Sequence, residues 1–347
     1  MGSYPIYEGQ IFLFLIVFSP SHVFFIITLI LGIIISISSN SWFGAWMGLE
    51  LNLLSFIPLI FIKNNQYSSE AALKYFLIQA LGSTVLLISA IMITIKINFS
   101  APLSTALLLK AGSAPFHFWF PPTLEGMLWP QALLLMTIQK ITPISLLSYY
   151  VAEQVVLIYL AVIMSAVVGA IGGLNQTLIR KLLGYSSINH IAWMISALLI
   201  RERTWLVYFI VYSIMSLSVV ILFHFTQTFH FNHLITNSSP SPVTKLAVFI
   251  SLLSLGGLPP FTGFIPKWII IQQLCWSNNF IILTILLWSS LFTLFYYLRI
   301  TMSSLMLNSV KSTWATKDIF INKVVITSIF INLIGLLIPS TAYSFII

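Results

Sequence analysis

Long apolar stretches alternate with short polar or Pro/Gly-rich interruptions along the whole chain. A helix needs about 20 apolar residues to cross a bilayer, and dividing the chain at its interruptions gives about eleven such stretches. The predicted spans cover approximately residues 22–39, 41–62, 69–95, 102–120, 129–150, 154–172, 181–200, 204–227, 243–274, 280–306 and 321–347. The pattern therefore predicts an all-α polytopic membrane protein.

Two of the predicted spans contain Gly and Pro at membrane depth beside a lysine. The fourth span is interrupted by "KAGSAP" and the ninth by "GGLPPFTGFIPKW". If the first ten spans form two groups of five, each broken helix is the fourth of its group. Because five is odd, the second group enters the membrane in the opposite direction, which predicts two inverted five-helix repeats. The alternative is that Gly and Pro are simply commoner in membrane helices.

These repeats give a simple division of the chain. The first repeat covers residues 20–152, the second covers 153–308, and a polar connection with a C-terminal helix covers 309–347. Residues 1–19 form an N-terminal extension of uncertain status, since their apolar run from Ile11 to Phe18 is too short to span by itself. Lys and Arg gather in the connections on one face, so the positive-inside rule places the N-terminus on the cytoplasm-like side and the C-terminus opposite.

Composition excludes several classes of protein. Of 347 residues, 59% are hydrophobic and only 6% are charged, so a water-soluble surface cannot be assembled. The net charge of +8 is scattered over short connections and indicates topology rather than nucleic-acid binding. The single cysteine, Cys275, excludes a Cys-based iron-sulfur site within this chain alone, and no Rossmann glycine fingerprint is present. We therefore expect no redox cofactor and no metal in this chain.

Four charged residues fall near the middle of predicted spans. Glu50, Lys110 and Lys140 lie roughly 12 to 17 Å along their helices, and Lys267 follows the second break at similar depth. Each intramembrane charge costs at least about 2.5 kcal/mol, so these side chains need partners or a hydrated interior. One interpretation is a buried Glu50–Lys110 pair that only locks helices together, but it leaves Lys140 and Lys267 unexplained.

Lysine suits a proton relay because burial disfavours its charged form and a nearby carboxylate restores it. Bringing opposite charges to 4 Å is worth about 4 kcal/mol at an effective dielectric constant of 20. Moving one proton against 100 mV costs about 2.3 kcal/mol. Making or breaking one such pair is therefore large enough to gate a proton.

Two histidines are further candidates for the relay. His117 lies just beyond Pro115, where it can pass protons through water or, equally, hydrogen-bond a freed carbonyl. His190, in "SSINHIAWM", either links the lysines of the first half to the second half or makes hydrogen bonds between helices. Gly44–Gly48 ("GAWMG") and Gly169–Gly173 ("GAIGG") are small-residue faces suited to tight helix packing.

Several long blocks resemble a known family. "SNSWFGAWMGLELNLLSFIP", "EAALKYFLIQA", "LLLKAGSAPFHFWFP", "TIQKITPIS", "GGLNQTLIRKLLGYSSINHIAWM" and "LSLGGLPPFTGFIPKW" are similar to subunit 2 of mitochondrial NADH:ubiquinone oxidoreductase, respiratory complex I. The resemblance covers about residues 21–347 and implies an antiporter-like membrane subunit. It implies that Glu50 and Lys110 form the coupling pair, that Lys140 is the central relay lysine, and that Lys267 is the terminal lysine.

The same resemblance implies partners and a location. The chain is expected to contact other complex I membrane subunits, including neighbouring antiporter-like subunits and small accessory subunits, and lipids. NADH, FMN, iron-sulfur clusters and ubiquinone are expected in partner subunits, with the N-terminus in the matrix and the C-terminus in the intermembrane space of the mitochondrial inner membrane. Two alternatives stay open: a subunit of a multi-subunit sodium/proton antiporter, and a structural membrane spacer with no relay role.

Overall fold

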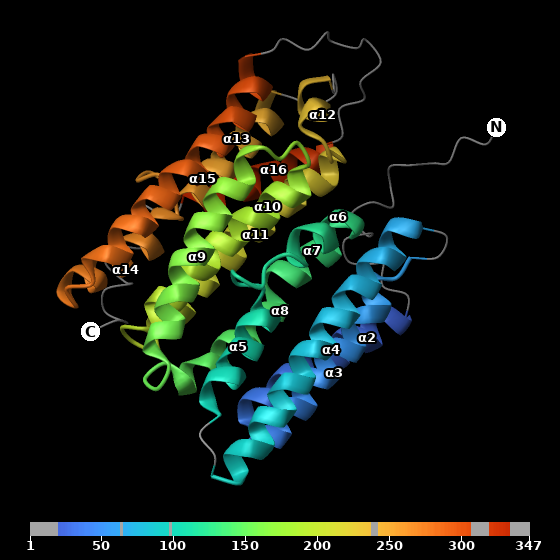
Figure 1. The fold of residues 1–347 in the computed structure, drawn as a ribbon. Helices are drawn as coiled ribbons and strands as arrows, with labels where there is room; N and C mark the ends of the chain where they lie inside the picture. Colours follow the sequence, from blue (N-terminus) through green and yellow to red (C-terminus); the bar gives the residue numbers. More distant parts are fainter. Residues whose placement is uncertain (1–19, 63–64, 97–98, 237–241, 307–318, 334–347) are drawn as a thin grey trace.

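The computed structural model describes residues 20–62, 65–96, 99–236, 242–306 and 319–333. Helices make up almost all of this part of the chain, and its β-pairing is an isolated bridge between Leu178 and His230 (Figure 1). The prediction of an all-α architecture is confirmed.

The helices of the first half follow the predicted order. They are α2 (Pro20–Ser38), α3 (Trp42–Ile60), α4 (Gln66–Thr94), α5 (Ser100–Ala111), α6 (Phe120–Gly126), α7 (Trp129–Met136), α8 (Ile138–Leu147) and the short 3₁₀ helix η1 (Ser148–Tyr150). Helix α5 forms the first part of the fourth predicted span, the predicted interruption follows it, and α6 begins only at the last residue of that span, Phe120. The fifth predicted span is also divided, into α7 and α8.

The helices of the second half repeat much of this order. They are α9 (Val155–Leu174), α10 (Ile179–Leu198), α11 (Thr204–Thr226), α12 (Phe231–Thr236), α13 (Pro242–Gly256), α14 (Phe264–Trp276), α15 (Phe280–Met306) and, after both halves, α16 (Ile319–Leu333). Helices α13 and α14 are the two parts of the ninth predicted span, so each half contains three long helices followed by a broken one.

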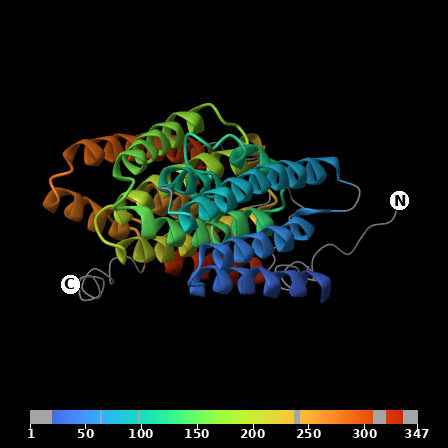
Figure 2. The ribbon, with the colours of Figure 1, turned by 60° about the horizontal axis from the view of Figure 1, so that its bottom comes forward.

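The two halves lie side by side. Helices α2, α3 and α4 occupy one edge and α13 and α15 the other, with α5 to α11 between them (Figures 1 and 2). Within the first half α5 packs on α4 and α8, and within the second half α15 packs on α9 and α13. The halves meet where α6 and α7 contact α10 and α11, and α16 packs on α11 and α13.

The distribution of side chains is that of a protein surrounded by lipid. Large apolar side chains point outward, for example Phe24 at 60% and Leu77 at 58% exposure, whereas Ser36 and Asn52 are buried. Buried hydroxyls bond to carbonyls of their own helix, as Ser36 does to Ile33 over 2.8 Å. Seven helical segments in the described residues are long and apolar enough to cross a membrane, if α7, α8 and η1 (Trp129–Tyr150) are taken as one segment, and Val243–Gly256 is a shorter apolar helix.

Both small-residue faces make the close contacts expected of them. A Cβ atom on Gly48 would lie 2.7 Å from the Gly32 carbonyl oxygen, so α3 packs directly on the backbone of α2. A Cβ atom on Gly169 would lie 2.6 Å from the amide nitrogen of Asn189, so α9 packs equally closely on α10. Each half therefore contains a helix pair whose spacing depends on glycine.

The count of eleven spans in two inverted repeats stays a prediction. Both predicted interruptions are present, and α10 matches the seventh predicted span although it is less apolar than its neighbours. The extension at residues 1–19 and the end of the last predicted span, beyond residue 333, lie outside the described residues.

Candidate functional site

The three lysines predicted at membrane depth are all buried. Lys110 is 5% exposed, Lys140 is 1% and Lys267 is 6%. Because burying a positive charge is costly, the groups around each ammonium determine what that lysine can do.

Lys110 lies in the last turn of α5, where the first broken helix is interrupted. The helix ends at Gly112, whose φ of 74° is left-handed. The Lys110 side chain runs along α4, since a Cβ atom on Gly82 would lie 3.1 Å from its Cγ and 3.4 Å from its Cε. Its backbone carbonyl accepts a hydrogen bond from Nε2 of Gln79, also on α4, over 3.4 Å. Helix α4 therefore holds both the backbone and the side chain of Lys110.

Glu50 and His117 have different relations to Lys110. Glu50, half-buried on α3, is close enough for a Coulombic interaction with Lys110 but forms no direct ion pair with it. His117 is buried in the interruption itself, and its Nδ1 lies 3.2 Å from the Pro115 carbonyl oxygen. Glu50 thus acts on Lys110 from a distance, whereas His117 is bound to the interrupted backbone.

Lys140 is placed by a break that the sequence analysis missed. Thr137, with φ −114° and ψ −78°, separates α7 from α8, and its hydroxyl donates to the Leu133 carbonyl over 2.7 Å. Lys140 follows in the first turn of α8, and Pro143 removes a backbone donor one turn later. That proline was the available sequence signal of an irregular helix here.

The Lys140 ammonium reaches from the first half into the second. It donates to the Ser187 carbonyl of α10 over 3.2 Å. It also lies 5.0 Å from the ring centroid of Phe120 on α6 and 5.3 Å from that of Tyr212 on α11. A backbone carbonyl and two aromatic faces therefore surround the charge.

A neighbouring polar group further fixes α8. Gln139 Nε2 donates to the side-chain oxygen of Asn52 over 2.9 Å, and the Tyr75 hydroxyl donates to Gln139 Oε1 over 3.1 Å. Asn52 lies two residues after Glu50 on α3. The helix that carries Glu50 is thus bonded directly to the residue before Lys140.

Lys267 lies in the first turn of α14, beyond the second break. Its ammonium donates to the Gly256 carbonyl at the end of α13 over 2.9 Å and lies 5.8 Å from the Trp193 ring. Gly257 has a left-handed φ of 78°, and a Cβ atom there would lie 2.8 Å from Lys267 Cδ. The lysine therefore bridges the break and compensates the negative end of the α13 dipole.

Helix α10 connects Lys140 with Lys267. Ser187, His190 and Trp193 are spaced three residues apart, so they form a stripe about 9 Å long on one side of the helix. Lys140 contacts this stripe at Ser187 and Lys267 contacts it at Trp193. His190 lies between them and interacts Coulombically with both lysines.

Two tyrosines of α11 line the same stripe. The Tyr208 hydroxyl lies 2.8 Å from His190 Nδ1, and its ring stacks on Trp193 with centroids 6.4 Å apart. The Tyr212 ring lies 4.8 Å from that of His190 and also faces Lys140. Sequence reasoning did not identify these tyrosines, because aromatic residues are common in apolar helices and nothing in their spacing indicates a neighbouring helix.

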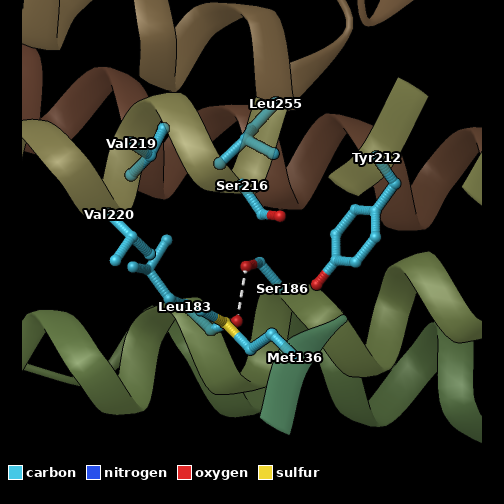
Figure 3. A pocket seen from close by; sticks show the side chains of 8 residues that line it. All are labelled: Met136, Leu183, Ser186, Tyr212, Ser216, Val219, Val220 and Leu255. Atoms are coloured by element: carbon cyan, nitrogen blue, oxygen red, sulfur yellow. Dashed lines mark hydrogen bonds between the residues drawn. The ribbon is translucent and has the colours of Figure 1, made fainter. Parts of the chain in front are cut away.

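A small cavity of about water size lies beside this arrangement. Figure 3 shows the hydroxyls of Ser186, Ser216 and Tyr212 around it, with Leu255 beside Ser216 and across the cavity from Ser186. Tyr212 contacts Lys140, and Leu255 precedes the Gly256 carbonyl that binds Lys267. The cavity therefore lies between the surroundings of the two lysines and offers hydroxyl groups to a water molecule.

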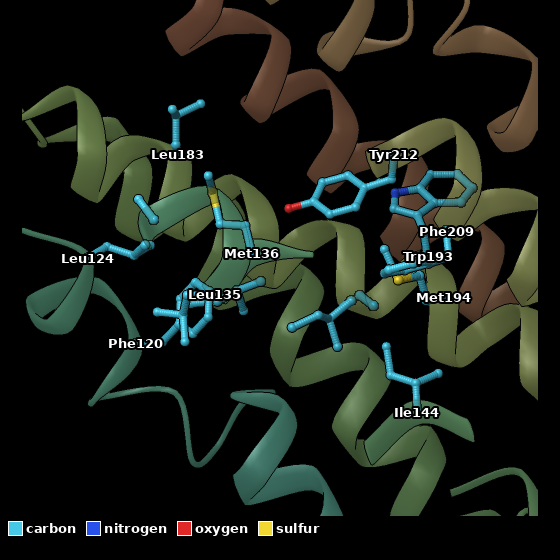
Figure 4. Close-up of a cluster of buried hydrophobic side chains, with 14 of the residues drawn as sticks. Phe120, Leu124, Leu135, Met136, Ile144, Leu183, Trp193, Met194, Phe209 and Tyr212 are labelled. Carbon is cyan, nitrogen blue, oxygen red and sulfur yellow. The ribbon is translucent and has the colours of Figure 1, made fainter. Parts of the chain in front are cut away.

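A dense apolar cluster surrounds the polar groups. It is formed by side chains of α6, α7, α8, α10 and α11, including Phe120, Met136, Ile144, Trp193 and Phe209 (Figure 4). Because such a cluster lowers the local dielectric constant, interactions among Lys140, His190 and Lys267 are stronger than they are in water.

The site contains titratable groups suited to proton transfer. Within the part of the chain that the structure describes, no group of three His, Cys, Asp or Glu residues could hold a metal ion. The structure brings Lys140, His190 and Lys267 together through α10. Glu50 and Lys110 form a separate group, and α5, which carries Lys110, packs on α8, which carries Lys140.

Two interrupted helices with a buried lysine at each interruption, and a third lysine between them, define an antiporter-like membrane protein. The family described as NADH:quinone oxidoreductase/Mrp antiporter, TM matches residues 39–101 and 96–293. Curated relatives narrow this class further. The chain is 48% identical over 322 residues to NADH-ubiquinone oxidoreductase chain 2 of Anopheles gambiae, covering 90% of this chain and 94% of the relative.

A second relative agrees with the first. NADH-ubiquinone oxidoreductase chain 2 of Aedes aegypti is 46% identical over 332 residues, covering 92% of this chain and 97% of the relative. The chain belongs to the NADH-ubiquinone oxidoreductase chain 2 family, within the NADH:quinone oxidoreductase/Mrp antiporter group.

Solved structures share the fold at lower identity. A chain of respiratory complex I from Thermus thermophilus superposes with a TM-score of 0.80 at 24% identity, covering 92% of this chain and 78% of that chain. A chain of the Mrp complex from Dietzia sp. DQ12-45-1b gives a TM-score of 0.71 at 16% identity, covering 85% and 61%.

Proposed function

We propose that this chain is a core membrane subunit of NADH-ubiquinone oxidoreductase that contributes to proton translocation coupled to quinone reduction by other subunits. Its similarity to chain 2 relatives over nearly the whole length supports the assignment to this enzyme. The observation that carries the proton role is the continuity from Lys140 through the Ser187–His190–Trp193 stripe to Lys267.

The mechanism begins in the first half. Redox work elsewhere in the assembly changes the attraction between Glu50 and Lys110, which are near enough to interact but are not in direct contact. A closer approach stabilises the charged lysine by up to about 4 kcal/mol, and separation releases its proton. Since this energy exceeds the cost of about 2.3 kcal/mol for one proton against 100 mV, the pair can gate a transfer.

The proton then passes between the halves. Lys110 exchanges it through water with Lys140, whose ammonium is held by one carbonyl and two rings rather than by a carboxylate. His190 accepts and donates protons between Lys140 and Lys267, with its ring oriented by the Tyr208 hydroxyl. The hydroxyl-lined cavity supplies space for a water molecule beside this step. His117 serves the interruption of α5, where it holds the freed Pro115 carbonyl.

The finer features follow from the same assignment. We propose two inverted five-helix repeats within eleven spans, with the N-terminus in the matrix and the C-terminus in the intermembrane space of the mitochondrial inner membrane. NADH, FMN, iron-sulfur clusters and ubiquinone are held by other subunits. Neighbouring antiporter-like subunits, small accessory subunits and lipids cover the apolar outer faces of α2, α4 and α15.

The test replaces Lys140 by Met in the assembled enzyme. Methionine keeps an apolar chain of similar length but carries no proton, so we expect pumping in proteoliposomes to fall at least about tenfold, a change of about 1.4 kcal/mol in the barrier. Arg203→Gln is the matched control, because it removes a positive charge from an exposed connection. If the Lys140→Met enzyme assembles normally and pumps fully, the relay role of Lys140 is wrong and the chain acts as a structural membrane spacer.

A second candidate is a subunit of a sodium/proton antiporter, which the fold shared with the Mrp complex favours. The two candidate functions differ in the subunits with which the chain assembles. Affinity purification of the native chain is expected to recover flavin and iron-sulfur subunits. Recovery of a complex without redox centres would favour the antiporter.

A further inference from the structure

One buried residue outside both halves bonds to both sides of the second break, through its side chain on one side and its backbone on the other. Asn332 lies near the end of the described part of α16 and is fully buried. Its Oδ1 lies 2.9 Å from the Ser254 hydroxyl of α13, whose single proton is shared with the Ser251 carbonyl at 2.7 Å, and its Nδ2 donates to the Ser218 hydroxyl of α11 over 3.3 Å. Nδ2 also donates to the Ser328 carbonyl of its own helix over 2.9 Å.

The backbone of Asn332 makes a fourth bond. Its carbonyl accepts from the Thr262 amide, in the interruption just before α14, over 3.1 Å. Asn332 therefore bonds Ser254 on one side of the break and Thr262 on the other. A buried polar group keeps such partners because leaving them unpaired is costly, so the arrangement fixes one geometry.

The geometry that Asn332 fixes determines the position of the Lys267 acceptor. Ser254 lies two residues before Gly256, whose carbonyl binds Lys267. Gly263 packs so closely on the Ser254 carbonyl that a Cβ atom there would overlap it, so the two sides of the break also touch directly. A shift of Ser254 relative to Thr262 therefore moves the carbonyl away from the ammonium.

The first break is held differently. Trp119 Nε1 donates to the Leu109 carbonyl over 3.2 Å, and Gln79 donates to the Lys110 carbonyl, so its bonds come from within the first half. Only the second break, among the described residues, is bonded to α16. Helix α16 is thus bonded to the break that lies beside Lys267.

We propose that Asn332 is a positioning residue for proton transfer: it holds the two sides of the second break so that the Gly256 carbonyl faces Lys267. The proposal rests on the proposed proton role of Lys267. The clamp itself is a structural statement and can be tested separately.

The first experiment measures the clamp without reference to activity. Hydrogen exchange is followed in the assembled enzyme for peptides covering residues 257–263. We expect Asn332→Ala to accelerate exchange there by about tenfold, since it removes the side-chain bonds that hold α16 against the break. Ser328→Ala is the matched control, because among the described residues the Ser328 hydroxyl bonds only to the Val325 carbonyl of its own helix. Equal exchange in both variants would overturn the proposal.

The second experiment measures the consequence for proton transfer. Asn332→Ala is expected to displace the pH profile of quinone reductase activity and to lower pumping about threefold or more, while Ser328→Ala keeps both unchanged. An unchanged profile in Asn332→Ala overturns the positioning role. If Asn332→Ala fails to assemble, Ser254→Ala removes one bond of the clamp and is judged by the same two measurements.

A third arm separates the two proposals. Lys267→Met in the same enzyme is expected to abolish pumping. If Lys267→Met pumps normally, the proposed function fails whatever Asn332 does. If Lys267→Met fails to pump but Asn332→Ala behaves like Ser328→Ala, only the positioning role is lost.

Discussion

The two broken helices use the same residue types in different ways. Each ends its first part at a left-handed glycine, Gly112 or Gly257, and each has a buried lysine beside it. Lys110 precedes its glycine and lies along the neighbouring helix α4, whereas Lys267 follows its glycine and bonds back to the carbonyl end of α13. The lysine of the first break is therefore freer to respond to Glu50, and that of the second is fixed by the backbone.

The helices that follow the breaks also differ. The fifth predicted span of the first half is divided at Thr137 into α7 and α8, whereas its counterpart α15 is one continuous helix, Phe280–Met306. The division turns the Lys140 ammonium towards α10 of the second half. The halves thus share an order of elements but not a set of roles, which accords with a transfer from the first half to the second.

The largest effect is expected at the second break. Gly257→Ala places a Cβ atom 2.8 Å from Lys267 Cδ and forces a left-handed φ on alanine, which costs roughly 1 to 2 kcal/mol. The substitution displaces the ammonium from the Gly256 carbonyl, so we expect quinone-linked pumping to fall by about tenfold or more. The prediction is checked by measuring proton pumping of the assembled Gly257→Ala enzyme in proteoliposomes.

The neighbouring glycine provides the control. A Cβ atom on Gly256 would meet its nearest neighbour, Tyr297 Cδ2, at 3.6 Å, an ordinary contact, so Gly256→Ala should pump normally. Gly112→Ala compares the first break with the second. It also forces a left-handed φ on alanine, but its Cβ atom would meet Phe120 and Trp119 and not a lysine. Identical losses in the three variants would show that the second break has no special relation to its lysine.

An intermediate effect is expected where α4 supports Lys110. Gly82→Ala places a Cβ atom 3.0 Å from Leu109 Cδ2 and 3.1 Å from Lys110 Cγ, both in flexible side chains that can move. Overpacking of this kind costs about 1 kcal/mol, so turnover should fall only a few-fold. Thr84→Ala removes an exposed hydroxyl from the same helix and should have no effect on turnover. A loss as large as that of Gly257→Ala would contradict the contrast between the two lysines.

The smallest effect is expected at the division between α7 and α8. Thr137→Val removes the hydrogen bond to the Leu133 carbonyl, and thermal unfolding of the purified enzyme should show a loss of about 1 kcal/mol. Thr142, also on this span, has a buried hydroxyl without a partner in the described structure, so Thr142→Val should be neutral or stabilising. Equal destabilisation by both variants would show that the Thr137 hydroxyl does not stabilise the break between α7 and α8.

Much of the candidate site was predictable from the sequence, and the features that were not predicted share one physical reason. Gly and Pro beside a lysine at membrane depth located both interruptions, and the cost of an intramembrane charge selected Lys110, Lys140 and Lys267. The separation of Glu50 from Lys110, the tyrosines beside His190 and the clamp at Asn332 all depend on how different helices pack on one another. Such contacts require the rotation of each helix about its axis, which an almost uniformly apolar sequence does not specify.

The sequence by itself determined the lipid surroundings, the positions of the two interruptions and the residues that are costly to bury, because transfer of a side chain into lipid has a free energy that depends mainly on that side chain. Tertiary structure decided which carbonyl or aromatic ring each buried ammonium group contacts. Lys140 bonds to Ser187 on another helix, and Lys267 bonds across its own break, although both are lysines in similar apolar surroundings. Hydrogen bonds are short and directional, so only the packed arrangement of helices determines which partner lies within reach.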